Sequence, residues 1–190
     1  RICFTILFCF CYMLVPIQGE AKPKEEYRGI EILFDAWGIP HVYSDTDAGA
    51  FYGLGYVTAK QRGFQMYYSL RIIQGRLAET IGNVTSTNGR TSALEHDRQM
   101  RTIGFYKTEK KRAQLLDKET WTFLQAYSEG VNDYFKETEG NLHYLFKKYQ
   151  ITPETWSPAD SIVSWWHMAQ FFAKDGLREL IPYHREQLPP

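Results

Sequence analysis

The stretch "YVTAKQRGFQMYYSLRIIQGRLAETIG", Tyr56 to Gly82, indicates the fold class of this 190-residue chain. Its apolar and small residues recur every three or four positions, which is the period of one face of an α-helix. They are Tyr56, Ala59, Gly63, Tyr67, Leu70, Ile73, Leu77 and Ile81. The pattern predicts one long helix that ends at Gly82, because glycine is the preferred residue just past a helix C-terminus.

Gly75 lies inside this predicted helix, where glycine costs roughly 0.5–1 kcal/mol relative to alanine. We therefore expect another backbone to come close to it, and we expect that backbone to belong to a partner chain. Arg76 and Glu79 are three residues apart, a spacing that allows an ion pair on the outer helix face. The motif is expected to serve an interface or the core rather than catalysis.

A β-hairpin is predicted upstream, in "RGIEILFDAWGIPHVYS", residues 28–44. Ile30, Ile32 and Phe34 alternate with polar residues, residues 35–38 form the turn, and a second alternating run follows. Pro40 restricts that second strand to a sheet edge or an interrupted strand. An isolated hairpin is marginal in water, so we expect further strands from another chain or from another part of the same precursor.

Two more long helices are predicted, which makes the chain α+β but mainly helical. One begins after Asp117 as N-cap. Its apolar face holds Trp121, Leu124, Tyr127, Val131 and Tyr134. The other begins with a capping box from Ser157 to Asp160, with Pro158 at the first helical position. Its apolar face holds Ile162, Trp165 or Trp166, Ala169 and Phe172. A short helix is expected within residues 141–150, and a loop is expected over residues 83–95.

The charge balance argues against a polyanionic partner. Lys plus Arg and Asp plus Glu both total 22, so no net field would attract nucleic acid. Aromatic residues make up 16% of the chain, and some of them are expected to face a partner or a ligand.

The N-terminus has the pattern of a secretory signal. Residues 2–19 carry no charge, and Gly19 and Ala21 offer a small-residue cleavage site. We expect residues 1–21 to be a signal peptide, residues 22–190 to form the exported chain, and its location to be periplasmic or extracellular. The alternative is a membrane anchor, but 18 helical residues span only ~27 Å, so no stable membrane span is expected.

No complete active site is visible in the sequence. The five histidines lack zinc-binding spacing, and no G-x-S-x-G serine motif occurs. All three cysteines precede residue 21, which leaves the exported chain without a thiol. Glu95 with Asp97 could serve as a glycosidase pair, for which the alternative interpretation is a helix cap. Asp45 with Asp47 could also serve as such a pair, and the alternative interpretation there is a turn.

Residues 34–82 strongly resemble the start of the penicillin acylase family, which includes penicillin G, cephalosporin and acyl-homoserine-lactone acylases. The positions that carry the resemblance are Asp35, Trp37, Gly38, Pro40, His41, Gly53, Gly55, Tyr56, Ala59, Arg62, Gln65, Met66, Arg71, Gln74, Gly75, Glu79 and Gly82. Residues 101–104, 126–132 and 153–160 resemble later blocks of the family's α subunit.

This resemblance implies an N-terminal nucleophile hydrolase with a four-layer αββα core that an α and a β subunit build together. The precursor cleaves itself, and the serine nucleophile begins the β chain. The catalytic residues would then lie outside this chain, whose partners are the β subunit and a small N-acyl amide substrate. No organic cofactor is implied.

The resemblance also assigns three residues to sites. Met168 and Phe172 match a Met and a Phe that line the acyl pocket in penicillin G acylases, and a spacing of four places them on one helix face. The family's arginine between them is replaced by Phe171, which favours an apolar entrance. Glu179 is the best match to the family's α-chain calcium ligand. The alternative to an enzyme subunit is a non-catalytic secreted helical module that keeps the ligand pocket.

Overall fold

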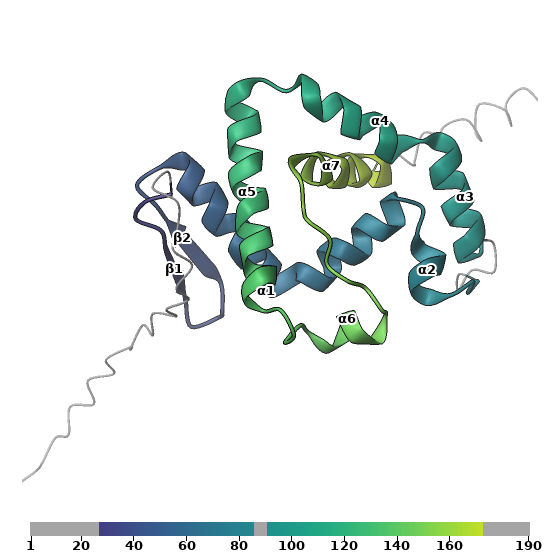
Figure 1. Ribbon diagram of the computed structural model, residues 1–190, viewed down its shortest axis with the longest axis horizontal. Coiled ribbons are helices and arrows are strands. Elements are labelled where there is room, and N and C mark those ends of the chain that lie inside the picture. The colour runs from purple at the N-terminus through teal and green to yellow at the C-terminus, as the bar shows by residue number, and fades with distance from the viewer. Residues whose placement is uncertain (1–26, 86–90, 173–190) are drawn as a thin grey trace, which may run out of the picture.

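The computed structural model describes residues 27–85 and 91–172 as a set of helices with one small hairpin (Figure 1). The elements are β1 (Glu31–Phe34), β2 (Pro40–Tyr43), α1 (Asp47–Ile73), α2 (Leu77–Ile81), α3 (Ala93–Ile103), α4 (Phe105–Arg112), a 3-10 turn (Ala113–Leu115), α5 (Lys118–Glu137), α6 (Tyr144–Lys148) and α7 (Pro158–Phe172). The predicted mainly helical α+β composition is confirmed for these residues.

The hairpin forms as predicted. β1 and β2 are antiparallel, with Glu31 opposite Tyr43 and Phe34 opposite Pro40. In the described part of the chain these two strands pair only with each other. Pro40 therefore sits on an edge, where its missing N–H breaks no ladder.

The closest helix contact joins α1 and α5 through two glycines. A Cβ atom on Gly55 would lie 2.0 Å from the Tyr127 carbonyl oxygen, and one on Gly130 would lie 2.0 Å from the Tyr52 carbonyl oxygen. No side chain fits in either gap, so the two helix backbones touch. This contact places α5 firmly across α1.

Tyrosine–carboxylate hydrogen bonds reinforce the same contact. Tyr52 donates its hydroxyl to Asp133 at 2.9 Å, and Tyr56 donates to Glu137 at 2.7 Å. Burial raises the pKa of both phenols above their usual value of 10.0, and the acceptor carboxylates raise it further. Both phenols therefore remain neutral donors through the physiological pH range.

An aromatic cluster fills the core between α1, α5 and α6. The Tyr67 ring meets Phe135, Phe146 and Trp156 edge to face, at centroid distances of 5.1, 6.1 and 5.6 Å. Phe146 comes from α6, the short helix expected within residues 141–150, and it is 4% exposed.

The long helix predicted to reach Gly82 ends early. α1 stops at Ile73, and Gly75 adopts φ +66°, a left-handed conformation that breaks the helix before α2. A Cβ on Gly75 would lie 2.7 Å from the Asp97 carbonyl oxygen. The backbone that approaches Gly75 thus belongs to α3 of the same chain, and the prediction of a partner chain there is wrong.

Two other expectations for this region hold. Gly82, with φ +73°, follows α2 as the predicted cap residue. Arg76 donates from Nε to Glu79 at 2.8 Å, the predicted ion pair. The apolar period of the sequence runs on past the end of α1. It does so because Leu77 and Ile81 of α2 are also partly buried, although the chain changes direction at Gly75.

The loop predicted over residues 83–95 ends earlier in the structure, because α3 already begins at Ala93. Ser92 caps α3 by accepting a hydrogen bond from the Glu95 N–H at 3.2 Å, so the helix begins at Ala93. α4, with the sequence FYKTEKKR, was not predicted individually, because its charged residues leave almost no apolar stripe.

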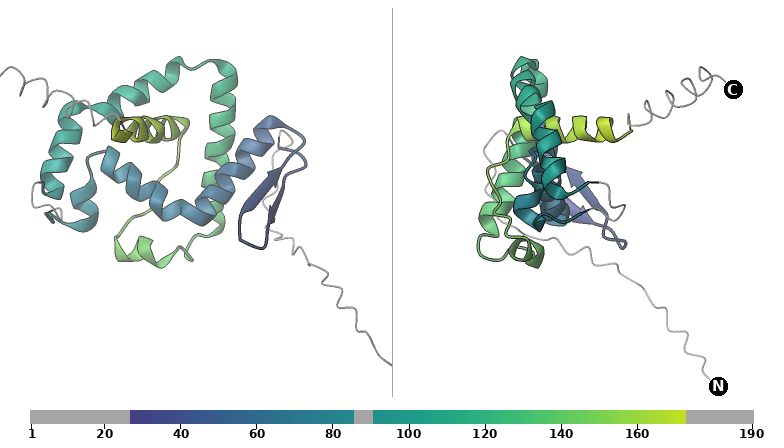
Figure 2. Two further views of the ribbon diagram at one scale, coloured as in Figure 1. Left: turned by 180° about the vertical axis from the view of Figure 1, so that it is seen from behind. Right: turned by 90° about the vertical axis from the view of Figure 1, so that its right-hand side faces the viewer.

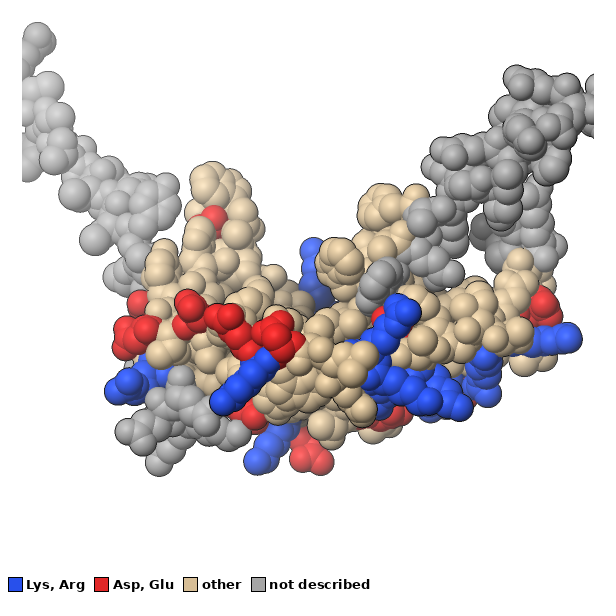
Figure 3. Space-filling view, turned by 90° about the horizontal axis from the view of Figure 1, so that it is seen from above, with Lys and Arg blue, Asp and Glu red and all other residues tan. Residues whose placement is uncertain are grey.

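The helices form a slab from which two elements protrude on the same side. Seen edge-on, the hairpin and α7 both extend from that face of the slab (Figure 2). In the space-filling view two largely uncharged projections rise with a hollow between them (Figure 3). This arrangement leaves the inner sides of the hairpin and α7 facing a shared concave surface.

We predict that Gly55→Ala destabilises the protein by about 1–3 kcal/mol, because the methyl group would overlap the α5 backbone. Urea denaturation followed by circular dichroism measures the effect. Lys111→Ala, on the exposed side of α4, is the control and is expected to leave the midpoint unchanged. Equal midpoints for both variants would show that the helices separate at no cost.

We also predict a loss of stability at alkaline pH. The folded state raises the pKa of Tyr52 and Tyr56, so the stability they contribute is complete below about pH 10 and declines as the pH rises above it. Tyr52→Phe is expected to flatten this decline in urea midpoint, whereas Tyr144→Phe, at a position 67% exposed, is not. Identical pH dependence in the two variants would contradict the role of Tyr52.

Candidate functional site

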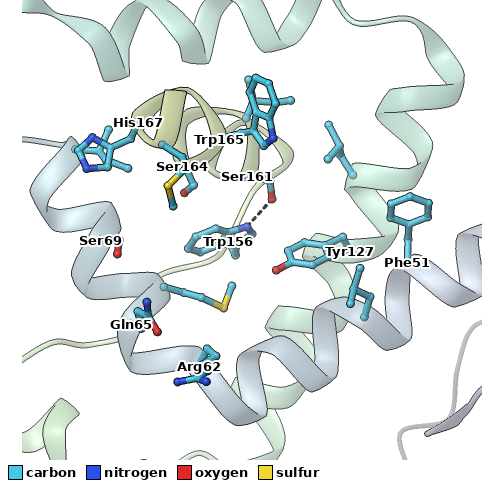
Figure 4. A pocket seen from close by; sticks show the side chains of 16 residues that line it. Phe51, Arg62, Gln65, Ser69, Tyr127, Trp156, Ser161, Ser164, Trp165 and His167 are labelled. Atoms are coloured by element: carbon cyan, nitrogen blue, oxygen red, sulfur yellow. Dashed lines mark hydrogen bonds between the residues drawn. The ribbon is translucent and has the colours of Figure 1, made fainter. Parts of the chain in front are cut away.

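The candidate site is an apolar cleft of about 920 Å³ between α1, α5 and α7 (Figure 4). Each helix contributes apolar side chains to its wall. They include Leu54 and Met66 from α1, Leu124 and Tyr127 from α5, and Ile162 and Met168 from α7. A cleft of this size and lining fits an apolar group.

The floor of the cleft is Trp156, which is 4% exposed. Its indole N–H donates to the Ser161 hydroxyl at 2.9 Å, the dashed bond in Figure 4. Asn132 on α5 holds the Trp156 backbone with both ends of its amide. Its Oδ1 accepts from the Trp156 N–H at 2.8 Å, and its Nδ2 donates to the Trp156 carbonyl at 2.9 Å.

Asp160 fixes the first turn of α7. Its Oδ2 accepts from the Ser157 backbone N–H at 2.9 Å and from the Ser157 hydroxyl at 2.6 Å, which confirms the predicted capping interaction. Its Oδ1 accepts from the Tyr106 hydroxyl at 2.9 Å. α7 is thereby anchored to α4 as well as to α5.

A group of charged residues ties the segment before α7 to the end of α1. Arg71, which is 9% exposed, binds Glu154 Oε1 through its Nη2 atom at 2.8 Å. Arg76 binds the same oxygen through its Nη1 atom at 3.1 Å. Burial opposes ionisation of Glu154, but the hydrogen bond from Arg76 and the charge of Arg71 outweigh it, so its pKa lies below the usual value. The ionised carboxylate therefore holds the two arginines together.

Two serine hydroxyls of the cleft form hydrogen bonds within the fold. Ser161 accepts from Trp156, and the Ser164 hydroxyl donates to the Asp160 carbonyl at 2.8 Å. Burial raises the pKa of Tyr127, which keeps its phenol protonated. These residues shape a binding surface for an apolar group.

Comparison with known proteins identifies the family. The sequence model of the penicillin amidase family matches residues 29–188. The chain belongs to the penicillin amidase family.

Individual relatives agree with this assignment. Penicillin G acylase of Escherichia coli is 32% identical over 155 residues, and acyl-homoserine lactone acylase QuiP of Pseudomonas aeruginosa is 33% identical over 149 residues. Penicillin acylase 2 proenzyme of Pseudomonas sp. strain SE83 is 32% identical over 149 residues. Each match covers 78% of this chain but only 16–18% of the relative, so the chain spans about a sixth of those proteins.

A solved structure shows the same fold. A chain of the thermostable penicillin G acylase from Alcaligenes faecalis superposes with a TM-score of 0.65 at 25% identity. The match covers 77% of this chain and 75% of the solved chain, so these two chains are similar in length.

The residues assigned from the family resemblance fall in different places. Met168 lines the cleft and is 56% exposed. Phe172 lies one helical turn further along, is 73% exposed and is not part of the cleft lining. Glu179 lies outside the described residues, as does the signal peptide predicted over residues 1–21.

The apolar face predicted for α7 is not the side of the helix that packs most closely against the described chain. Ala159 and Val163, at 5% and 0% exposed, pack inward, whereas Trp165 and Phe172 are more than 70% exposed. Apolar residues occur around most of this helix, so periodicity could not show which side the chain itself covers. Trp165 and Met168, on the exposed side of α7, line the cleft.

Asp97 caps a helix, as the alternative interpretation held. Its two carboxylate oxygens accept from the Leu77 and Ala78 N–H groups at 2.7 and 2.8 Å, and the residue is 5% exposed. This arrangement commits both oxygens to the start of α2 and argues against a glycosidase pair with Glu95. Asp47, the partner suggested for Asp45, lies in the first turn of α1.

Sequence reasoning missed Asn132 and Tyr106 as determinants of the cleft. Asn132 stands in the block 126–132 that resembles the family, which was a usable signal. No sequence signal marked Tyr106, because its partner Asp160 is 54 residues away.

Within residues 27–85 and 91–172, no three metal-binding side chains of the His, Cys, Asp or Glu type converge. The helices in those same ranges include none with the length and hydropathy needed to cross a bilayer.

We predict that Asn132→Ala loosens α7 and destabilises the protein by about 1–3 kcal/mol, because it leaves the buried Trp156 N–H and C=O without partners. The urea midpoint, followed by circular dichroism, measures the change. Gln125→Ala, which removes only a partly buried bond to Glu129 on the same helix, is the control. A wild-type midpoint for Asn132→Ala would show that water replaces the amide without cost.

Proposed function

We propose that the chain is the α-subunit part of an exported acylase that hydrolyses the amide bond of small N-acyl compounds. The observation that carries this proposal is the apolar cleft, which opens on the concave face of a chain that belongs to the penicillin amidase family. The cleft has the chemistry to hold an acyl group, and the group that attacks the amide would come from a second chain.

The relative lengths support a second chain. The curated relatives are several times longer than this chain, and one of them is named a proenzyme. The superposed chain of the solved acylase, by contrast, is about the length of this one. Both facts fit a precursor that yields a separate chain of this size.

The proposed reaction follows from the family resemblance. The hydroxyl of a serine at the start of the second chain attacks the amide carbonyl, and its proton passes through the serine's own amine to the leaving nitrogen. The C–N bond breaks, the amine departs and an acyl ester remains. Water then cleaves the ester to release the acid. This chain contributes no bond-making atom; it holds the acyl group and excludes water from it.

Met168 is the described residue best placed for that task. It lines the cleft from α7, and Leu124 and Tyr127 line the same cleft from α5. Phe172 is proposed to join it only when the second chain covers that end of α7. The substrate class is an amide with an apolar acyl group, because Phe171 stands where the resemblance implies an arginine.

Calcium would need ligands from outside the described residues. Oxygen ligands suit this ion, and six to eight of them are usual. The described residues alone do not fit a calcium site, since no acidic cluster is present among them. Glu179 is proposed as one ligand of a site shared with the second chain, and a periplasmic or extracellular location is proposed from residues 1–21.

A non-catalytic helical binding module is the second candidate, favoured by the largely apolar lining of the cleft. The coding sequence that follows Pro190 and mass spectrometry of the natively expressed protein separate the two. Two chains, with a serine at the N-terminus of the second, support the acylase. A single chain ending near Pro190 with no amidase activity overturns it.

We predict that Met168→Ala in the processed protein shifts acyl preference. Removing the side chain deepens the cleft, so kcat/KM is expected to fall about 10-fold for short acyl groups and to fall less for longer ones. Leu115→Ala, at a position 84% exposed on the 3-10 turn, is the control. Equal losses across all chain lengths would remove Met168 from the acyl site.

A further inference from the structure

Trp37 is the most exposed large apolar residue at the tip of the hairpin, with 85% of its surface open. Leaving a large apolar side chain in water is costly, since fully burying one yields about 1.5–3 kcal/mol. Its neighbour Ile39 is 54% exposed. The tip therefore presents an apolar pair that the described part of the chain does not cover.

The turn that carries Trp37 is rigidly built. Asp35 Oδ1 accepts from the Trp37 N–H at 2.9 Å and from the Ile39 N–H at 2.8 Å. Gly38 donates its N–H to the Asp35 carbonyl at 3.0 Å and adopts φ +77°, which glycine tolerates without strain. These bonds fix the backbone on both sides of the indole.

The tip is also fastened to α1. Gln61 Nε2 donates to the Gly38 carbonyl at 3.2 Å, and the Lys60 ammonium lies 5.6 Å from the centre of the Phe34 ring. The hairpin thus cannot fold away to bury Trp37 without breaking contacts with the longest helix.

An ordered but exposed tryptophan is typical of a docking anchor. Binding is less favourable when flexible groups must be immobilised. A turn that is already rigid loses little conformational entropy on binding. Tryptophan is enriched among the few interface residues that dominate binding energy. The hairpin that carries Trp37 also protrudes on the same side of the slab as α7 (Figure 2).

We propose that Trp37 is the anchor by which the hairpin docks onto the remaining polypeptide of the same precursor, inserting its indole into an apolar pocket there. This inference rests on the proposed function, because it requires a second chain. The occupant follows from the lengths, since most of each curated relative lies outside the region this chain covers. The hairpin and α7 then hold the partner from the two sides of the hollow.

The test uses the full precursor with an affinity tag on this chain. Trp37→Ala is compared with Trp37→Phe and with the control Tyr144→Ala, whose side chain is 67% exposed on α6. We expect dissociation of the two processed chains to be at least about 30-fold faster in Trp37→Ala, intermediate in Trp37→Phe and unchanged in Tyr144→Ala.

Thiol labelling provides an independent measurement on the tagged chain. All natural cysteines precede residue 21, so Trp37→Cys places a single thiol in the exported chain. We expect it to react at least 10-fold more slowly in the two-chain protein than Tyr144→Cys does. This measurement also decides the case in which Trp37→Ala does not accumulate.

The outcomes separate the two proposals. Two processed chains whose dissociation and labelling are insensitive to position 37 overturn the anchor and leave the proposed function intact. A wild-type protein that contains only this one chain overturns both. Slower labelling at position 37 together with faster dissociation of Trp37→Ala supports both.

Discussion

Backbone contact between α1 and α5 is the constraint on which the rest of the structure depends. Gly55 and Gly130 each lie where a methyl group would overlap the carbonyl oxygen of the other helix, so the two glycines set the distance and the crossing point. The aromatic cluster around Tyr67 and the tyrosine–carboxylate bonds then fill the space that this contact defines. Polar residues on α5 acquire fixed positions as a result.

One of those positions gives the cleft its shape. Asn132 belongs to α5 and holds the backbone at Trp156, which precedes α7 by two residues. Asp160, bonded to Tyr106 of α4, fixes the first turn of the helix. The chain therefore places Met168 through a series of hydrogen bonds that begin at the α1–α5 contact. Met168 itself contributes little to its own placement, since it is more than half exposed.

The sequence predicted local features well and long-range ones poorly. Asp117, Ser157 and Gly82 act within a few residues of themselves, so the helix boundaries they signal could be predicted. The break at Gly75 could not, because it depends on α3, which approaches from more than 20 residues further along the chain. A glycine in a helical pattern indicates a close approach but does not name the approaching segment.

The same limit applied to the site. Family resemblance directed attention to α7, and the structure places Met168 at the cleft but leaves Phe172 outside its lining. Periodicity selected a different face of α7 from the one that packs inward, because apolar residues occur around most of this helix. Trp165 and Phe172 of α7 and Trp37 of the hairpin stay exposed within the described residues.

The anchoring of α7 at its first turn makes the helix a lever arm. From Asp160 to Met168 the axis extends about 12 Å at 1.5 Å per residue, so a tilt of about 5° at the root displaces the Met168 position by about 1 Å. Substitutions near Tyr106 or Asn132 can thus change the width of the cleft without touching its wall. Natural divergence of substrate preference in this family would then be recorded at the root of α7 as well as in the pocket wall.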